Sequence, residues 1–237
     1  MSVSRQVLAG PRGASVILLS VAGESTNRGV VLCPEVRGLD ANMEDYAARV
    51  VAEGYRVAIV DPWARHGGVP PLDAPEAIHA AVARIDDGLA VGDVAFARTC
   101  LGDVAGAAVL GFCLGGLHAR LAAACVHGFD AAVEYYGRIV YPTLTPEKPV
   151  QPLDLLPGRR SALLCHFGTD DPVAPPAHVD ELERRLASQP IPARVHRYPA
   201  CGHGFANPAS PGWNAEAAAL SWARSLRWLD EHLAGGG

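Results

Sequence analysis

The sequence predicts an α/β protein whose mostly parallel, doubly wound sheet is covered by helices on both faces. Short runs rich in β-branched residues alternate with stretches of helical periodicity along almost the whole chain. The run at 29–33 is apolar from its second residue to its last, which is typical of a strand buried on both faces. The chain has 237 residues, of which 49% are hydrophobic and 19% charged, enough for one sizeable core. We therefore expect residues 1–237 to form a single domain.

Seven segments have the length and composition of strands. They are 15–20, 29–33, 56–60, 107–110, 130–135, 161–167 and 193–197. A turn is predicted after the first of them, at 23–25. The alternation of these strands with helices favours a parallel, doubly wound sheet.

Helices are predicted between the strands because apolar residues recur there at helical spacing. They span 40–53, 76–98, a segment directly after residue 113, 177–187 and 213–233, with 235–237 frayed. The long helix at 76–98 is expected to break near Gly88 and Gly92. Residues 142–160 carry five prolines and little periodicity, so they are predicted as a surface loop over the site.

Composition limits the classes of partner. The net charge of −5 gives no signal for binding a polyanion, so nucleic acid is not an expected partner. No segment approaches the ~20 apolar residues that span a bilayer, so no membrane is expected either. The six cysteines include no Cys-x-x-Cys pair, and three of them lie in or beside apolar runs. This usage favours a reduced, cytoplasmic protein.

One segment has the layout of a nucleophile elbow. A short apolar strand leads into Gly-Phe-Cys-Leu-Gly-Gly at 111–116, and a helix rich in small residues follows at once. The turn is so tight that only small residues fit two positions before and after the nucleophile, where Gly111 and Gly115 stand. We therefore predict Cys113 as the nucleophile rather than as a buried small side chain. The N–H of Leu114, at the helix N-terminus, is placed to bind an oxyanion.

A thiol has an unperturbed pKa of about 8.5, so the cysteine needs a partner that removes its proton near neutral pH. In a fold with this elbow, an acid and then a histidine follow the nucleophile in the chain, each on a loop after a strand. The loop at 168–175 follows one predicted strand and contains two aspartates. Of the nine histidines, His203 alone is bracketed by glycines after the last strand, which makes it the candidate base.

With these features the chain resembles the dienelactone hydrolase (carboxymethylenebutenolidase) family of the α/β-hydrolase fold, over about 30–205. The motifs that carry the resemblance are Pro-Glu-Val-Arg-Gly-Leu at 34–39, Asp-Pro-Trp-Ala-Arg at 61–65, the elbow at 111–116, Tyr-Tyr-Gly at 135–137 and Gly-His-Gly-Phe-Ala at 202–206. Taken singly several are weak, but in this order they are specific.

The resemblance implies a role for each residue of the site. Cys113 would be the nucleophile, His203 the base, and Asp171 the acid, because the family's aspartate stands four residues before a proline. Glu35 would contact the resting thiol and take its proton when substrate arrives. The N–H of Val36 would join that of Leu114 in the oxyanion hole.

The resemblance to the family is weaker at the residues that would bind the substrate. The family carries an arginine after the His-x-Phe-Ala motif to hold a substrate carboxylate, whereas Asn207 stands there in this chain. A second substrate arginine has no clear counterpart, with Arg84 only a loose candidate. We expect a preference for neutral esters and lactones, because an amide cannot reproduce the bidentate arginine fork. The residues expected to contact substrate are Arg37, Trp63, Arg65, Tyr136, Arg138, Phe205 and Asn207.

Together these observations predict a hydrolase of small-molecule esters or lactones that forms a thioester on Cys113 and needs no cofactor. A monomer or small homo-oligomer is expected. No metal is expected, because His66 and His79 are not paired with other ligands at metal-binding spacing. Two alternatives remain open: an acyltransferase or cyclase with the same machinery, and a non-catalytic relative that acts as a binding protein.

Overall fold

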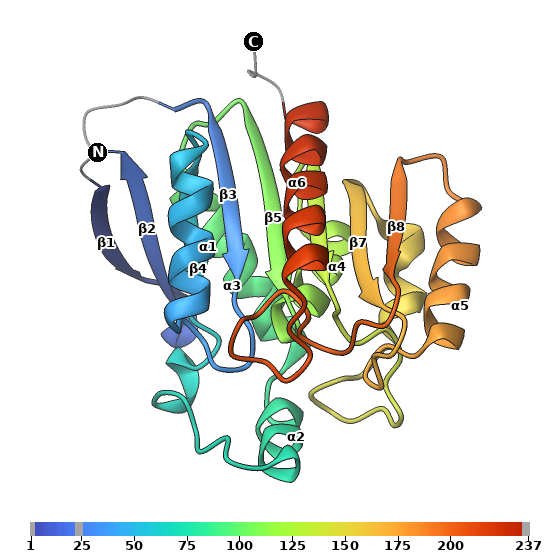
Figure 1. The fold of residues 1–237 in the computed structure, drawn as a ribbon. Helices are drawn as coiled ribbons and strands as arrows, with labels where there is room; N and C mark the ends of the chain where they lie inside the picture. The colour runs from blue at the N-terminus through green and yellow to red at the C-terminus, as the bar shows by residue number, and fades with distance from the viewer. Residues whose placement is uncertain (1–2, 22–25, 234–237) are drawn as a thin grey trace.

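The computed structural model describes residues 3–21 and 26–233, and its strands form one sheet in the order β1-β2-β4-β3-β5-β6-β7-β8 (Figure 1). The strands are β1 Val3–Ala9, β2 Ser15–Val21, β3 Arg28–Cys33, β4 Arg56–Val60, β5 Gly106–Phe112, β6 Ala131–Tyr135, β7 Ala162–Gly168 and β8 Ala193–Tyr198. Strands β3 to β8 run parallel, and β1 and β2 extend one edge antiparallel. The predicted α/β class with a mostly parallel sheet is confirmed.

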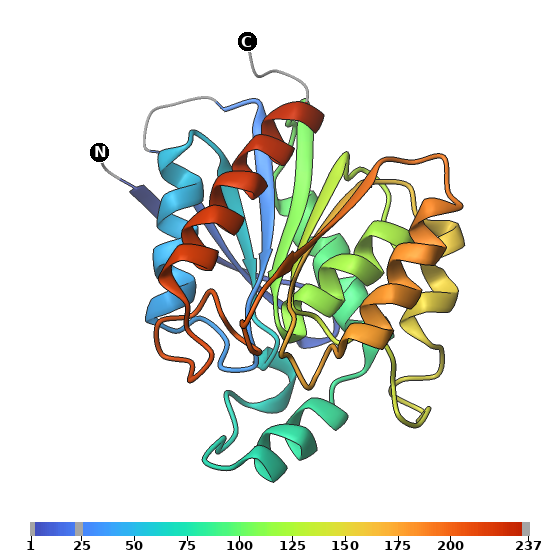
Figure 2. The same cartoon turned by 45° about the vertical axis from the view of Figure 1, so that its right-hand side comes forward.

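Helices cover both faces of the sheet, as Figures 1 and 2 show. They are α1 Ala41–Ala52, α2 Pro75–Ala83, α3 Asp87–Cys100, α4 Leu114–Cys125, α5 Pro176–Ala187 and α6 Ala215–His232, with short 3-10 turns η1 Pro11–Gly13, η2 Ala64–His66 and η3 Pro152–Gly158. The apolar residues of α1 and α6 pack on one face of the sheet, and those of α3, α4 and α5 pack on the other. Helix α2 stands beyond the carboxyl ends of the parallel strands.

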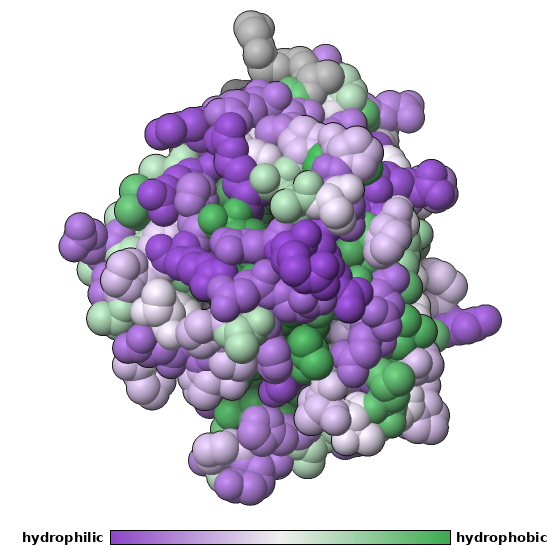
Figure 3. All heavy atoms as spheres, turned by 90° about the vertical axis from the view of Figure 1, so that its right-hand side faces the viewer, coloured by the Kyte–Doolittle hydropathy of each residue, from purple (hydrophilic) through white to green (hydrophobic). Residues whose placement is uncertain are grey.

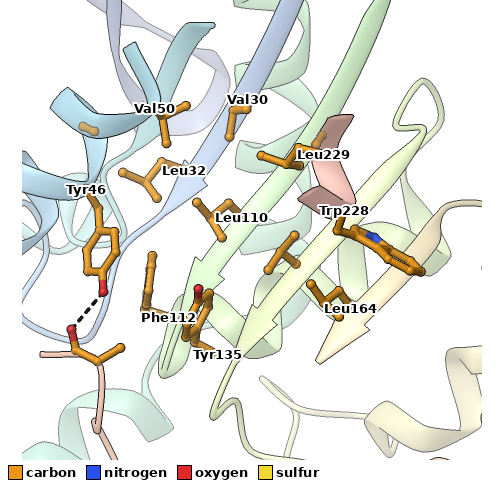
Figure 4. Packing of buried hydrophobic residues seen from close by; sticks show 14 of the residues in the cluster. Val30, Leu32, Tyr46, Val50, Leu110, Phe112, Tyr135, Leu164, Trp228 and Leu229 are labelled. Carbon is orange, nitrogen blue, oxygen red and sulfur yellow. Dashed lines mark hydrogen bonds between the residues drawn. The ribbon is translucent and has the colours of Figure 1, made fainter. Parts of the chain in front are cut away.

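The face under α1 and α6 shows how the core supports the site (Figure 4). Leu32 and Leu110 from neighbouring parallel strands are fully buried between the two helices. On α1, the Tyr46 hydroxyl donates to the carbonyl of Ala206 at 3.0 Å, and its ring packs against that of Phe112 in a tilted arrangement at a centroid distance of 4.5 Å. This side chain therefore joins α1 to the last residue of β5 and to the loop at 202–206.

The structure corrects the prediction for the segment 76–98. Two helices occupy it, α2 and α3, and the break lies at 84–86 rather than at Gly88 and Gly92, which are both inside α3. The reason is a cap, because the Asp86 carboxylate accepts a hydrogen bond from the N–H of Leu89 at 2.8 Å and so starts a new helix.

Strand β1 was not predicted from the sequence. Among the described strands it pairs only with β2, and nearly all its side chains are exposed, so it lacks the apolar pattern of a buried strand. At the other edge of the sheet, Arg197 of β8 pairs with Asp180 and Glu183 of α5. Polar side chains cover most of the face on this side, as Figure 3 shows, and charge on an edge strand blocks pairing with another sheet.

The predicted turn at 23–25 and the frayed end at 235–237 lie outside the described residues. Within the described residues, no helix combines the length and the apolar character needed to cross a bilayer.

Candidate active site

Cys113 lies at the turn between β5 and α4, in a backbone conformation that non-glycine residues rarely adopt. Its φ is 53° and its ψ is −112°. A Cβ on Gly111 would collide with the carbonyl oxygen of Gly115, and a Cβ on Gly115 would collide with the carbonyl oxygen of Cys33. Both glycines are therefore required for β5, α4 and β3 to meet this closely, and the strained turn presents the thiol at the carboxyl edge of the sheet.

His203 lies between Cys113 and Asp171. Its Nε2 is 3.1 Å from the Sγ of Cys113, and its Nδ1 is 2.9 Å from Oδ2 of Asp171. The loop that carries it packs against the end of β7, where a Cβ on Gly168 would collide with the carbonyl of Cys201. Three residues from three different loops are thus brought into one hydrogen-bonded row.

Asp171 is held so that one oxygen is reserved for the histidine. Its side chain is fully buried, and its Oδ1 accepts from the backbone N–H groups of Val173 and Ala174 at 2.7 and 3.2 Å. The neighbouring Asp170 is exposed and bonds only with the hydroxyl of Thr169 among the described side chains. The structure therefore brings Asp171, and not Asp170, to His203.

The electrostatic surroundings favour the charged form of His203. Burial acts against protonation, but the electrostatic interaction with Cys113 and the hydrogen-bonded Asp171 carboxylate outweigh it, so the pKa of His203 lies well above its ordinary value. An imidazole in this setting is able to hold a proton taken from the thiol.

Glu35, on the loop after β3, lies beside this row and is held by two side-chain donors. The hydroxyl of Tyr136 donates to its Oε1 at 2.9 Å, and the amide of Asn207 donates to its Oε2 at 2.6 Å. Only 7% of Glu35 is exposed. Burial raises the pKa of the carboxyl above its ordinary value, while the bonds from Asn207 and Tyr136 act in the opposite direction.

The expected contact between Glu35 and the resting thiol is not formed. Among the described residues, the hydrogen-bond partner of the Cys113 sulfur is His203. Proton transfer from Cys113 to His203 needs no movement, whereas transfer to Glu35 would require the carboxylate to leave Tyr136 and Asn207.

The two N–H groups expected to form an oxyanion hole lie on elements that touch. The loop after β3 abuts the first turn of α4, and the side chains of Val36 and Leu114 share one buried cluster with Trp63. Within the described chain, neither N–H donates a hydrogen bond to a protein acceptor. Trp63 fixes this loop, because its Nε1 donates to the carbonyl of Val36 at 2.6 Å.

Three of the expected substrate contacts are part of the protein's own framework. Tyr136 and Asn207 are buried around Glu35, and the Oδ1 of Asn207 also accepts from the N–H of Ala209 at 2.8 Å, so both ends of its amide are occupied. Phe205 is fully buried in the core cluster. Their contacts position the site rather than present a free polar group to a substrate.

The three expected arginines have different surroundings. Arg37 is exposed and donates to the carbonyl of Leu72 at 3.3 Å. Arg138 is partly exposed at the end of β6. Arg65 forms an ion pair with Asp93 of α3 and lines a separate cavity, so the structure does not bring it to the cysteine.

A buried ion pair beneath the elbow was missed in the sequence. Arg120 of α4 and Glu134 of β6 are fully buried and paired, and the Arg120 guanidinium also donates to the carbonyl of Arg138. Burial raises the pKa of Glu134 to about 7, against the opposing effect of Arg120. The sequence signal was one charged residue inside each of two apolar runs, which predicts that the two charges pair.

The residues described do not bring three or more His, Cys, Asp or Glu side chains together in a group that could hold a metal ion. His66 instead lies against the Trp63 ring, at a centroid distance of 5.7 Å.

Comparison with known proteins identifies the family of this chain. The model of the dienelactone hydrolase family matches residues 17–233. The carboxymethylenebutenolidase of Rhodococcus opacus is 34% identical over 226 residues, which cover 90% of this chain and 85% of that protein. A crystal structure from Klebsiella pneumoniae named "Putative Dienelactone Hydrolase" has a TM-score of 0.87 at 22% identity, covering 98% of this chain and all of that one. A dienelactone hydrolase-like promiscuous phosphotriesterase from metagenomic libraries has a TM-score of 0.79 at 21% identity, again with 98% of this chain covered. The chain therefore belongs to the dienelactone hydrolase family, and it is a hydrolase of that type.

Proposed function

We propose that this protein hydrolyses small esters or lactones through a thioester on Cys113. The observation that carries the proposal is the row Cys113–His203–Asp171, which is joined by hydrogen bonds of 3.1 and 2.9 Å. This is the arrangement of a nucleophile, its base and the group that orients the base. The strained elbow and its two required glycines support the same assignment.

The reaction follows from these contacts. His203 Nε2 takes the thiol proton, and the Cys113 sulfur attacks the substrate carbonyl carbon while the N–H groups of Leu114 and Val36 bind the oxyanion. The tetrahedral intermediate collapses to the thioester, and the imidazolium gives its proton to the departing alkoxide. Water then attacks the thioester with His203 again as base, which releases the carboxylate and restores the thiol.

We assign Glu35 to the support of the charged histidine. Its carboxylate is buried beside His203, and the Tyr136 ring contacts His203 at a centroid distance of 5.2 Å while its hydroxyl holds Glu35. A negative charge held there favours the imidazolium that forms when the thiol is deprotonated. In Glu35→Gln the amide keeps the shape of the side chain and loses the charge, so we expect slower acylation.

The same contacts support a preference for uncharged substrates. Asn207 is occupied at both ends, and a substrate carboxylate placed against it would meet the like charge of Glu35. The comparison that tests this is kcat/KM for a dienelactone carboxylate against its methyl ester. A carboxylate preferred by about tenfold or more, about 1.4 kcal/mol, would refute the preference and make Arg37 and Arg138 the first anchors to mutate.

The reaction class is tested with a panel of aryl esters and lactones and with Cys113→Ala. We expect turnover by the wild type, loss of turnover in the variant, and a covalent adduct on the wild-type Cys113 after acid quench, seen by mass spectrometry of the intact protein. Unchanged activity in Cys113→Ala would refute the assignment of Cys113 as the nucleophile.

A further inference from the structure

A cavity that Cys113 does not line lies near the carboxyl edge of the sheet. It has a volume of about 290 Å³ and is bounded by the end of β4, the turn η2, the start of α3 and one residue of α4. Apolar groups form much of its wall, among them Val60, Pro62, Ile85 and Leu89. None of its lining residues belongs to the row at Cys113 or to the pair Glu35 and Asn207, so the cavity is separate from the site described above.

A buried histidine without a partner lines this cavity. His118 lies on α4, one turn beyond Leu114, and only 5% of it is exposed. Burial, with a smaller effect from Lys148, lowers the pKa of His118 to about 3, so the ring is neutral at ordinary pH. Its Nε2 is buried and makes no hydrogen bond to any described residue. An unpaired buried polar atom costs stability, and an apolar side chain on this helix would avoid that cost.

The other notable side chains of the cavity are cationic and lie at its mouth. Arg12 and Arg84 are both exposed, and neither guanidinium has a hydrogen-bond or ion-pair partner in the described parts of the chain. Arg65 also lines the cavity but is fixed on Asp93. The remaining carboxylate, Asp86, is held as the cap of α3. The mouth therefore has two available positive groups and one carboxylate that is already hydrogen-bonded.

From this arrangement we propose that the cavity binds a small organic carboxylate that carries a second polar group at its other end. The carboxylate is bound at the mouth by Arg12 and Arg84, whose planar forks match its two oxygens. The apolar body lies against Ile85 and Leu89, and the far hydroxyl or carbonyl pairs with the imidazole of His118. A volume near 300 Å³ suits a compact ring compound and lies at the lower end of the range for ligand pockets. This inference does not depend on the proposed reaction.

The test uses 4-hydroxybenzoate as probe, with benzoate and 4-hydroxybenzamide as matched compounds that lack the hydroxyl and the charge. In protein labelled with 15N-histidine, we expect the probe to shift the imidazole signals of His118 and to leave those of His203 unchanged. By calorimetry we expect 4-hydroxybenzoate to bind more tightly than either matched compound. Arg84→Gln and Arg12→Gln are each expected to lower the affinity for 4-hydroxybenzoate by about tenfold.

Two further variants separate a role in binding from a role in folding. His118→Leu is expected to keep or raise the melting temperature, because the imidazole nitrogen that it removes is buried without a partner. The same variant should bind 4-hydroxybenzoate no more tightly than the wild type binds benzoate. Arg49→Gln, on the opposite face of the sheet, is the control and should bind as the wild type does. The proposal is overturned if about 10 mM probe gives no shift at His118, if His203 shifts instead, or if Arg49→Gln weakens binding as much as Arg84→Gln.

Discussion

Replacing Asp171 by asparagine should stop catalysis by fixing the wrong tautomer of His203. The Oδ1 of Asp171 accepts from the N–H groups of Val173 and Ala174, so the oxygen of the new amide must take that position. The amide NH₂ then faces the Nδ1 of His203, which has to accept. The proton of the neutral imidazole is thereby placed on Nε2, facing Cys113, and the ring is unable to take the thiol proton.

The size of the expected fall in kcat/KM follows from the loss of the base. The corresponding Asp→Asn change in a serine protease triad lowers kcat by about 10⁴-fold. We expect kcat/KM for an activated aryl ester to fall by about 10³- to 10⁴-fold, or about 4 to 5.5 kcal/mol. The pKa of His203 should also fall, because Asp171 is one of the groups that raise it. The stability should stay within about 1 kcal/mol of wild type, since both loop hydrogen bonds are kept.

Asp170→Asn is the matched control, because the same chemical change is made one residue away at an exposed position. Steady-state kinetics between about pH 6 and 9 and thermal melting of both variants give the comparison. The reasoning is refuted if Asp171→Asn keeps more than about a tenth of the wild-type kcat/KM, or if Asp170→Asn loses as much.

The remaining predictions concern the framework of the site. Gly111→Ala should destabilise the protein by about 3 kcal/mol or more in urea denaturation, because the new Cβ meets backbone that has no room to move, whereas Gly92→Ala, with open space at its Cβ, should be neutral or slightly stabilising. Tyr136→Phe should cost about 1.5–3 kcal/mol, because buried Glu35 loses one of its two side-chain donors, and a melting temperature equal to that of wild type would contradict this. Glu134 has a folded pKa of about 7 against an ordinary value of 4.5, so the native state binds more protons and the free energy of unfolding should fall as pH rises between these values. The free energies of unfolding of the wild type and of Glu134→Gln are compared between these two pH values. If the difference between the two proteins does not change with pH, the titration of Glu134 is excluded as the cause.

The features of this protein that depend on local constraints can be predicted from its amino-acid sequence. The elbow at 111–116 could be recognised because a sharp strand-to-helix turn demands small residues at fixed spacing, and the structure shows that Gly111 and Gly115 tolerate no Cβ. The apolar run at 29–33 likewise identified a strand of the parallel sheet, since a strand covered on both faces has few polar positions. The loops with Asp171 and His203 followed from the order of these strands.

Contacts between side chains from distant segments are visible only in the folded protein. Tyr136 and Asn207 lie 101 and 172 residues from Glu35 in the chain, so no local pattern shows that both donate to its carboxylate. For the same reason Asn207 was interpreted as a substrate contact, and the pair Arg120–Glu134 was missed although each residue stood out in its apolar run. The cavity at His118 likewise depends on packing, because a cavity exists only between elements. The break between α2 and α3, by contrast, has a local cause, because Asp86 caps α3 through a residue only three positions away. Local backbone geometry is determined by short stretches of sequence, whereas the partners of buried polar groups are determined by the packing of distant segments.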